Sequence, residues 1–564
     1  MKRNYLLIIL FFISSIFTLS HGAKEPKWLK KVRMAQVTVL AYDEKDEMHQ
    51  TQGLFIDGRG TVITEYDALK GARKIVVVDT NGKEHPVTSI AGANSMYNLS
   101  KFNVKLDDKD KIAFAEQSST DANEQDIVYI LPGVQADKSN VAVQDTIIKV
   151  EKFKETYNYY TLANMVNERQ ANSPVFNEAG QLVGLIQLPS GEGKNAFVID
   201  SKFATDMQIT AMDAANADLK AIKVHKQLPS KQEDAASFIF LVGTRDTTQY
   251  LEYVDEYIRN FPGSTTGYTM KAEMLLSKKD YAAAKEVYTQ ALAIDSIKQD
   301  EIHFSLAKKV YELNLTPGYE VYEDWTMEKS LSEAEEAYKL NPLPAYMQTQ
   351  AGSLYALKRY QEAYDKYMAL TQTNLRTPEI FLYAAQCKQM SKAPTEEILA
   401  LQDSAIASFG KPYPQVAANY FLMRGNTRAQ LEKYRDAVAD FNEYEKIMGF
   451  NVTANFYYER EQLEVKCRMF AAALNDIERA IKLAPKEPVF WAESAALNYR
   501  VGQIEDAIAV AQEAIKVDDK FPDIYRILGV CYNQQGKTTE AKKYLQKAIE
   551  LGDTIAKGIL DKMK

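Results

Sequence analysis

The chain carries few of the side chains that act as nucleophiles, strong bases or metal ligands. Its 564 residues include five histidines and three cysteines, namely Cys387, Cys467 and Cys531. Zinc sites need cysteines and histidines at short, regular spacings, and disulfide frameworks use cysteines in even numbers. These three cysteines lie far apart and cannot all pair, so we interpret them as small buried apolar residues. We therefore expect no metal, no cofactor and no disulfide chemistry.

Serine chemistry is the remaining route to covalent catalysis. A serine becomes a nucleophile when a histidine takes its proton and a carboxylate orients that histidine. Ser173 lies in the turn-like sequence Ala171-Asn-Ser-Pro174. Beyond the N-terminal segment the histidines are His49, His85, His225 and His303. We interpret each of them as a surface or strand-end residue rather than as a general base.

The elements that must hold these side chains differ between the two halves of the chain. Residues 33–200 contain short β-branched runs separated by turn residues, and Asn81-Gly82 is a hairpin signal between two of them. The expected strands are 36–42, 53–56, 61–64, 74–79, 85–90, 126–131, 141–151, 157–162, 181–188 and 196–199. Many short strands without helices between them predict a sandwich or barrel rather than a parallel sheet.

From about residue 240 the pattern is helical and repeats with a period of 34 residues. Large and small residues recur at this spacing: Tyr457, Trp491 and Tyr525, then Ala473, Ala507 and Ala541, then Ala480, Ala514 and Ala548. The aromatic rings fill the space between layers, and the alanines let helices approach closely where they cross. The pattern resembles the tetratricopeptide repeat (TPR), which implies an α-solenoid. We expect about eight helical hairpins between residues 260 and 553.

The β half resembles trypsin-fold serine proteases, and most closely the Deg/HtrA-like branch. Gly53-Leu-Phe-Ile-Asp-Gly-Arg-Gly-Thr-Val-Ile-Thr64 is similar to the strand pair that leads to the catalytic histidine of that family. The segment 97–104 stands where the family places its aspartate. The segment 171–186 is similar to the nucleophile turn and the hairpin after it. The resemblance implies an all-β double barrel.

The same resemblance implies that the catalytic triad is missing. Asp67 stands at the histidine position, Asn98 at the aspartate position and Ala171 at the serine position. A carboxylic acid with the ordinary pKa near 3.9 is a poor base for a hydroxyl group, and alanine has no nucleophilic atom. Arg169-Gln170 and Asn172-Ser173 also replace residues that shape the family's oxyanion turn. We expect a pseudoprotease.

The N-terminal sequence indicates the compartment of the protein, and its net charge bears on nucleic-acid binding. Lys2 and Arg3 precede an apolar run over residues 5–17, and small residues follow up to Ala23. This pattern is typical of a secretory signal peptide; an uncleaved anchor is the alternative. We expect export to a bacterial periplasm or the medium, with no membrane span after signal removal. The formal net charge of −8 disfavours nucleic acid, which requires a concentrated basic face.

These patterns divide the chain into four predicted parts. They are a signal peptide (1–22), a trypsin-like domain (23–225), a polar linker (226–240) and a TPR domain (241–564). In TPR proteins, first-helix side chains at recurring positions line a peptide groove. In the register of the aromatic residues, these positions include Tyr458, Tyr499, Arg500, Arg526 and Asn533.

The expected function is therefore binding of proteins or peptides through the TPR groove. One alternative is a serine-type endopeptidase with a rearranged active site, or a regulator of such a protease. Another is a carbohydrate-binding accessory protein, which would need an exposed aromatic platform.

Overall fold

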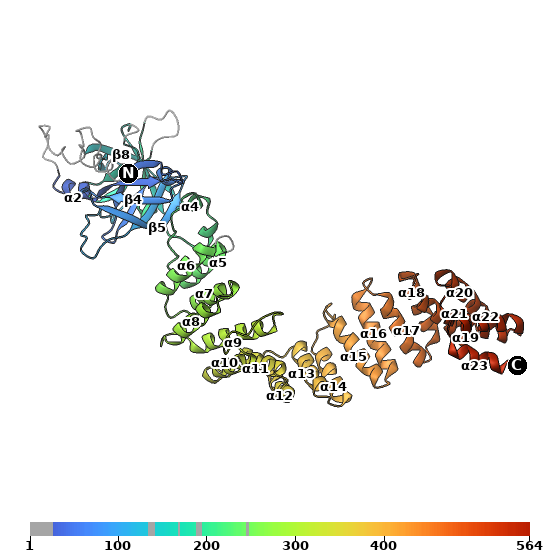
Figure 1. The fold of residues 1–564 in the computed structure, drawn as a ribbon. Helices are drawn as coiled ribbons and strands as arrows, with labels where there is room; N and C mark the ends of the chain where they lie inside the picture. Colours follow the sequence, from blue (N-terminus) through green and yellow to red (C-terminus); the bar gives the residue numbers. More distant parts are fainter. Residues whose placement is uncertain (1–25, 134–141, 167–169, 188–194, 244–246, 564) are drawn as a thin grey trace. The chain divides into compact units, whose positions relative to one another are not determined.

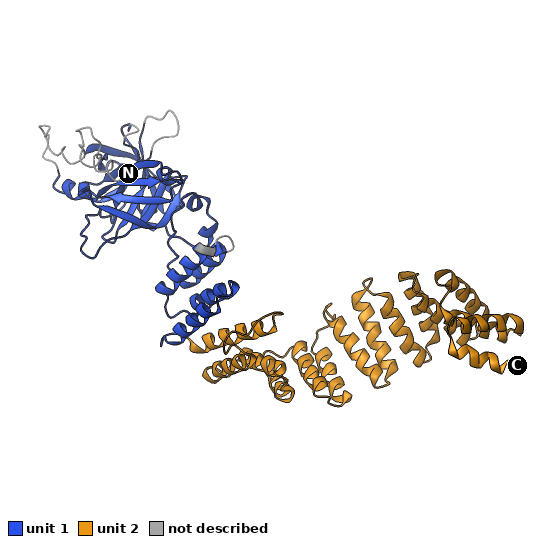
Figure 2. Ribbon diagram, in the orientation of Figure 1, with its two compact units in different colours: residues 1–297 blue, residues 298–564 orange. Residues whose placement is uncertain are grey.

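The computed structural model describes residues 26–133, 142–166, 170–187, 195–243 and 247–563. These residues form a β domain that is followed by helical repeats (Figure 1). The chain divides into two compact units, residues 1–297 and residues 298–564 (Figure 2). The predicted signal peptide, residues 1–22, lies outside the described residues.

Within the described residues, the β domain consists of two closed antiparallel barrels of six strands each, as the resemblance implies. The first has the order β1-β2-β3-β6-β5-β4, with β1 (Gln36–Tyr42), β2 (Met48–Phe55), β3 (Thr61–Thr64), β4 (Lys74–Val78), β5 (Glu84–Asn94) and β6 (Leu99–Val104). The second has the order β10-β11-β12-β9-β8-β7, with β7 (Ile127–Ile130), β8 (Val143–Phe153), β9 (Tyr157–Leu162), β10 (Pro174–Phe176), β11 (Leu182–Gln187) and β12 (Phe197–Asp200).

Alternating side chains build the core of the first barrel. Val37, Val39 and Ala41 of β1 are buried, while the residues between them are more exposed. Gly53 of β2 lies against them, and a Cβ atom there would come within 2.9 Å of side-chain atoms of Val39 and Val62. The glycine that opens the predicted motif is therefore required by close packing inside the barrel.

A separate apolar cluster joins the two barrels. Leu54, Ile63 and Leu99 contribute to it from the first barrel, and Phe176 and Leu185 contribute from the second. The short helices α2 (Leu29–Ala35) and α3 (Ser201–Asp206) also pack into this cluster. Burial of apolar surface at this boundary holds the loops of both barrels in fixed positions.

The segment predicted as a linker, residues 226–240, belongs to the packed first unit instead. Its backbone runs beside β5, where the N–H of Gln227 donates to the carbonyl of Ile90 over 2.8 Å. Helix α5 (Gln232–Gly243) follows, and its Phe238 is buried in the apolar core of the first barrel. Because the segment begins with polar residues, its sequence did not indicate the apolar helix face that follows. Burial of that face stabilises the packed helix by more than the conformational entropy that a flexible linker would keep.

The short helix η1 (Asp67–Leu69) lies between β3 and β4 of the first barrel. After the second barrel and α3, the chain continues through η3 (Ala211–Ala215), α4 (Ala217–Ala221), α5 and α6 (Thr247–Asn260). Helices α7 (Thr265–Ser277) and α8 (Tyr281–Leu292) then form a hairpin that still belongs to the first unit.

The second unit consists of consecutive helical hairpins and a terminal helix. The helices are α9 (Gln299–Leu315), α10 (Met327–Leu340), α11 (Pro344–Ala356), α12 (Tyr360–Leu370), α13 (Pro378–Met390), α14 (Thr395–Ala407), α15 (Ala417–Gln430), α16 (Tyr434–Met448), α17 (Ala454–Lys466), α18 (Phe470–Leu483), α19 (Pro488–Arg500), α20 (Ile504–Val517), α21 (Pro522–Gln534), α22 (Thr538–Glu550) and α23 (Thr554–Lys562). None of the helices in the described ranges is long and apolar enough to span a bilayer.

The small residues of the predicted repeat lie where helices cross. Ala473, Ala507 and Ala541 are fully buried. Gly529 of α21 packs so closely on α22 that a Cβ atom would lie 2.6 Å from Cγ of Leu545. Small side chains at these crossings let the two helices of each hairpin approach, which is the packing that the 34-residue period predicts. The predicted fold class, a trypsin-like double barrel followed by an all-α TPR-like solenoid, is confirmed.

Candidate functional site

Strands β3 and β6 bring Asp67 and Asn98 together. The strands pair antiparallel, with Thr64 opposite Ser100, so the residues just beyond these ends are neighbours. The backbone N–H of Asp67 donates to Oδ1 of Asn98 over 2.9 Å. Asn98 has a φ of 47°, in the left-handed region that asparagine adopts more readily than most residues. The Asn98 amide thus holds the backbone at residue 67, while the Asp67 side chain is exposed.

The turn that contains Ala171 is tied to the same place. Asn172, with a φ of 57°, donates from Nδ2 to Oε2 of Glu65 over 2.7 Å. Oε1 of Glu65 accepts a hydrogen bond from the hydroxyl group of Thr51. Because Glu65 lies two residues before the Asp67 position, the second-barrel turn lies beside it. We define the triad region as these residues: Asp67, Asn98, Ala171, Glu65 and Asn172.

The serine and the histidines that could supply proton transfer are held in other environments. Ser173 is buried, at 4% exposure. His85 is buried beside Asp79, with Nε2 and Oδ2 3.5 Å apart. His49 is exposed on β2, whereas His225 and His303 pair with Glu256 and Glu333. Arg169 of the predicted oxyanion turn lies outside the described residues.

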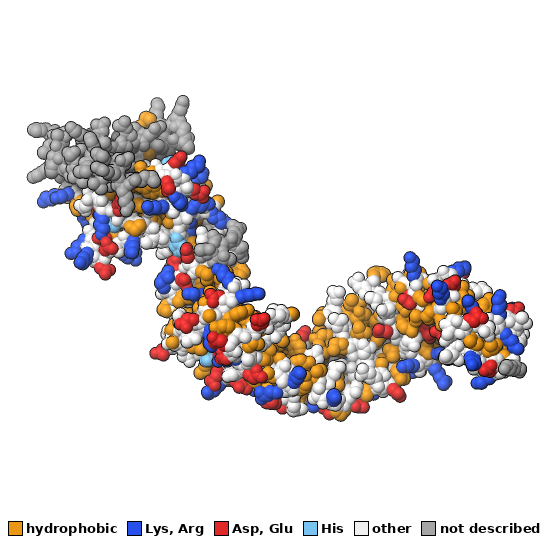
Figure 3. Space-filling view, viewed as in Figure 1, with side chains coloured by type: hydrophobic (Ala, Val, Ile, Leu, Met, Phe, Trp, Pro, Cys, Tyr) orange, Lys and Arg blue, Asp and Glu red, His pale blue; other side chains and the backbone are white. Residues whose placement is uncertain are grey.

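The predicted groove residues lie on α17, α19 and α21, the first helices of three successive hairpins. Arg500 and Asn533 are exposed, and Tyr458 and Tyr499 are half-buried. The Tyr458 ring packs against that of Phe490, with centroids 5.3 Å apart. On the face shown in Figure 3, basic and acidic side chains are intermixed over the repeats. These four residues therefore keep at least part of their surface available to a partner.

Arg526, the fifth predicted groove residue, is held by its own repeat. Its guanidinium pairs with Asp523 and with Asp553, whose Oδ2 lies 2.6 Å from Nε. Asp553 in turn accepts hydrogen bonds from the backbone at the start of α23. Arg526 thus anchors the terminal helix, and its place among the groove residues stays a prediction. The sequence hid the contact because Asp553 lies outside the 34-residue register.

Two ion pairs inside the repeats, each with a buried aspartate, were not predicted from the sequence. Arg424 binds Asp440, with Nε and Oδ2 3.0 Å apart, and Arg460 binds Asp476, with the same atoms 2.6 Å apart. In each hairpin the arginine comes three residues after the large aromatic position, and the aspartate comes three residues after the buried alanine. Arg424 recurs as Arg460 and Asp440 recurs as Asp476, each after 36 residues, and this recurrence is a signal that could have revealed the pairs.

Two buried glutamates on α17 accompany these pairs. Glu461 is fully buried and Glu464 is 3% exposed; within the described residues, Oε1 of the first and Oε2 of the second have no hydrogen-bond partner. Burial, with a smaller effect from Glu493, raises the pKa of Glu461 to about 8. Burial, with a smaller effect from Asp476, raises the pKa of Glu464 to about 7. Both acids therefore change charge near neutral pH.

The cysteines and acidic groups offer little for thiol or metal chemistry. Across the described residues, no group of three or more His, Cys, Asp or Glu side chains is placed to hold a metal ion. Cys387 and Cys531 are buried, and all three cysteines are free. Burial raises the pKa of the Cys387 and Cys531 thiols to about 11, so they stay protonated and unreactive at neutral pH.

Comparison with protein families agrees with this two-part architecture. Residues 51–185 match the trypsin-like peptidase domain. Residues 265–297 and 494–554 match tetratricopeptide repeats.

Relatives with known names match only parts of the chain. A small glutamine-rich tetratricopeptide repeat-containing protein 2 from Mycosarcoma maydis is 33% identical over 93 residues, which are 16% of this chain and 26% of that protein. DnaJ homolog subfamily C member 7 from Homo sapiens is 26% identical over 102 residues, 18% of this chain and 19% of that protein. The matched part of the chain thus spans about a quarter or less of the length of these relatives. The serine endoprotease from Yersinia pestis, a solved structure, is 15% identical with a TM-score of 0.28, covering 33% of this chain and 65% of that one.

Proposed function

We propose that this chain, in which a trypsin-like peptidase domain is fused to TPR repeats, is an exported protein-binding scaffold whose protease fold no longer catalyses proteolysis. The N-terminal pattern supports export to a periplasm or to the medium. The repeats support protein or peptide partners, because each hairpin adds a layer to an extended binding surface.

The observation that carries this proposal is the hydrogen bonding of the triad region. The three loops that the resemblance assigns to the triad positions contribute a backbone N–H, two amides and a carboxylate to these hydrogen bonds. Glu65 accepts hydrogen bonds from both barrels and so fixes the turn of Ala171 to the first barrel. Such contacts stabilise the fold, and they offer neither a nucleophile nor a general base next to it.

The first prediction is that the purified protein is catalytically silent. It should neither cleave casein nor react with a fluorophosphonate probe, because Ala171 supplies no nucleophile and loss of one triad member costs about 10⁴ to 10⁶ in turnover. Intact-mass measurement after labelling checks this. An active protease of the same fold serves as the positive control, and labelling of one serine per chain would contradict the proposal.

Restoring the three residues tests whether the rest of the site is still competent. The triple change Asp67→His, Asn98→Asp and Ala171→Ser should remain about 10² to 10³-fold below an active protease. The reason is that Asn172 still ties the nucleophile turn to Glu65 and leaves the oxyanion donors out of place.

The second prediction concerns the partner surface of the repeats. The double change Arg500→Ala and Asn533→Ala should weaken partner binding about tenfold or more, because both side chains are exposed on first helices and can bind a peptide's polar groups. Partners are first identified by affinity capture from the native envelope and then titrated by calorimetry. The matched control is Lys482→Ala with Lys543→Ala, two exposed residues on second helices. If both double variants lost the same affinity for the partner, the assignment of the groove residues would be wrong.

A further inference from the structure

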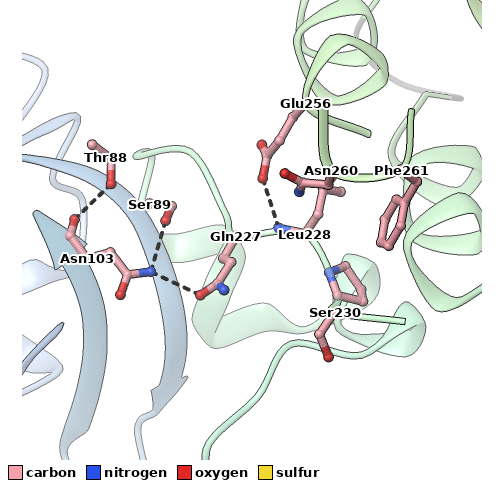
Figure 4. A pocket seen from close by; sticks show the side chains of 10 residues that line it. Thr88, Ser89, Asn103, Gln227, Leu228, Ser230, Glu256, Asn260 and Phe261 are labelled. Atoms are coloured by element: carbon pink, nitrogen blue, oxygen red, sulfur yellow. Dashed lines mark hydrogen bonds between the residues drawn. The ribbon is translucent and has the colours of Figure 1, made fainter. Parts of the chain in front are cut away.

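A polar cavity of about 520 Å³ lies on the outer side of the first barrel, well away from the triad region. Its floor is formed by Thr88 and Ser89 of β5 and Asn103 of β6. Asn103 is five positions from Asn98, roughly 17 Å along an extended strand. The walls are the segment 227–230 and the C-terminal end of α6 (Figure 4). The volume lies within the range of small-molecule sites.

The walls of this cavity are tied together by hydrogen bonds. Nδ2 of Asn103 donates to Oε1 of Gln227 over 3.0 Å and to Oγ of Ser89 over 3.3 Å (Figure 4). Oε2 of Glu256 lies 2.5 Å from Nε2 of His225. These contacts join strand, loop and helix, so the cavity exists before a ligand enters.

The lining selects ligands by charge. Among the described lining residues there is no lysine or arginine, and Glu256 is the one charged side chain. The nearby Lys226 turns its Nζ to the backbone carbonyl of Ile222, 2.7 Å away. A carboxylate and the negative end of a helix favour ligands that donate hydrogen bonds. Phosphate esters and carboxylates are therefore disfavoured.

Besides Glu256, the side chains that line the cavity carry hydroxyl groups or amides, or are apolar, namely Leu228, Pro229 and Phe261. Gln227, Ser230 and Asn260 are exposed at the rim, and the half-buried Phe261 supplies the apolar wall (Figure 4). An extended peptide would need a free strand edge, but β5 is paired with β4 and β6, and Ile90 is bonded to the adjoining segment. A compact neutral ligand with many hydroxyl groups and one apolar face fits this set best.

We propose that this cavity binds a neutral saccharide, with one sugar ring against Phe261 and its hydroxyl groups hydrogen-bonded to Gln227 and Asn260. Oε1 of Glu256 accepts a further hydroxyl group. The inference goes beyond the proposed scaffold function and does not depend on it, because the cavity involves neither the triad region nor the groove residues.

Calorimetric titration of the full chain tests the proposal. The probes are glucose, galactose, mannose, N-acetylglucosamine and their β-linked disaccharides. At least one should bind with a dissociation constant of about 1 mM or below. Asn260→Ala and Gln227→Ala should each weaken that binding about fivefold or more, since each removes a hydrogen bond. Asn374→Ala, an exposed asparagine outside both the cavity and the groove, should leave it unchanged, and a thermal melt confirms that each variant is folded.

Three outcomes would overturn the saccharide site. One is the absence of binding by every sugar of the panel. Another is binding that Asn260→Ala and Gln227→Ala leave unchanged. The third is binding of glucose 6-phosphate or of a neutral hexapeptide as tightly as the best sugar. None of these outcomes bears on proteolytic silence or on partner capture, so the two proposals fail separately.

Discussion

Replacing Arg460 with leucine should destabilise the C-terminal repeats by about 3 to 5 kcal/mol, the cost of leaving one member of a buried ion pair alone. The side chains of Arg460 and Asp476 are only 5% and 4% exposed. Arg460 also binds Glu445, with Nη1 and Oε2 2.7 Å apart. Without the guanidinium, Asp476 loses its ionic partner at a position where little of its side chain is exposed to solvent. Urea unfolding of the full chain, followed by far-UV circular dichroism, measures the loss.

A second variant separates the loss of the pair from the loss of packing. The neighbouring hairpin has Val510 at the position that corresponds to Asp476, and the last hairpin has Leu528 at the position of Arg460. Arg460→Leu combined with Asp476→Val should therefore recover at least half of the lost stability, because apolar replacement of a whole buried pair is often neutral.

Arg479 provides a matched control for the burial argument. It binds the same Glu445 over 2.7 Å, but its side chain is 41% exposed. Arg479→Leu should cost less than about 1 kcal/mol, since an exposed pair gains little over solvated ions. Equal losses for Arg460→Leu and Arg479→Leu would show that burial does not set the strength of these pairs.

The parts of the fold that follow a regular period could be predicted from the sequence. Alternation on β1 and the 34-residue recurrence of Ala473, Ala507 and Ala541 both report which face of an element is buried. The triad positions followed from a resemblance, and pairing of β3 with β6 brings Asp67 next to Asn98. Such patterns can be detected in the sequence because every repeat unit has the same packing requirement.

The features that were missed depend on contacts between distant residues. Helix α5 was taken for a linker because Lys226 to Asp234 is polar, whereas its packing depends on Phe238 meeting the first barrel. The role of Arg526 depends on Asp553, 27 residues away. The saccharide cavity combines two strands, a loop and a helix from separate parts of the chain. No single segment carries a signal for such sites.

Raising the pH from 6 to 9 should weaken the C-terminal repeats, and Glu461 and Glu464 together should account for roughly 3 to 4 kcal/mol of the loss. Their pKa values rise from the ordinary 4.5 to about 8 and about 7. The folded state thus retains protons that the unfolded chain releases, so unfolding becomes easier as the pH rises. The stabilisation is fully present below about pH 4.5 and is lost by about pH 8.

The surroundings of the two acids explain why neutralisation is favoured. Glu461 faces Glu493 and Arg500 of α19, and the repulsion from Glu493 outweighs the attraction of the exposed arginine. Glu464 is surrounded by the following charged groups: Asp476 and Arg479 of α18, Glu445 of α16 and Arg460 of its own helix. The paired arginines are already bound to Asp476 and Glu445, and within the described residues neither glutamate forms a salt bridge.

The change Glu461→Gln should remove most of this pH dependence, because glutamine keeps the shape of the neutral acid and cannot ionise. At pH 9 the variant should be more stable than the parent chain by about 4 to 5 kcal/mol, and at pH 5 by about 1 kcal/mol or less. Urea titrations at pH 5, 6, 7, 8 and 9 measure both curves. Glu478→Gln on α18, an exposed residue, is the matched control and should leave the pH profile unchanged. Parallel profiles for the parent and Glu461→Gln would mean that residue 461 is already ionised in the folded repeats at neutral pH, and that the layer between α17 and α19 tolerates the buried charge.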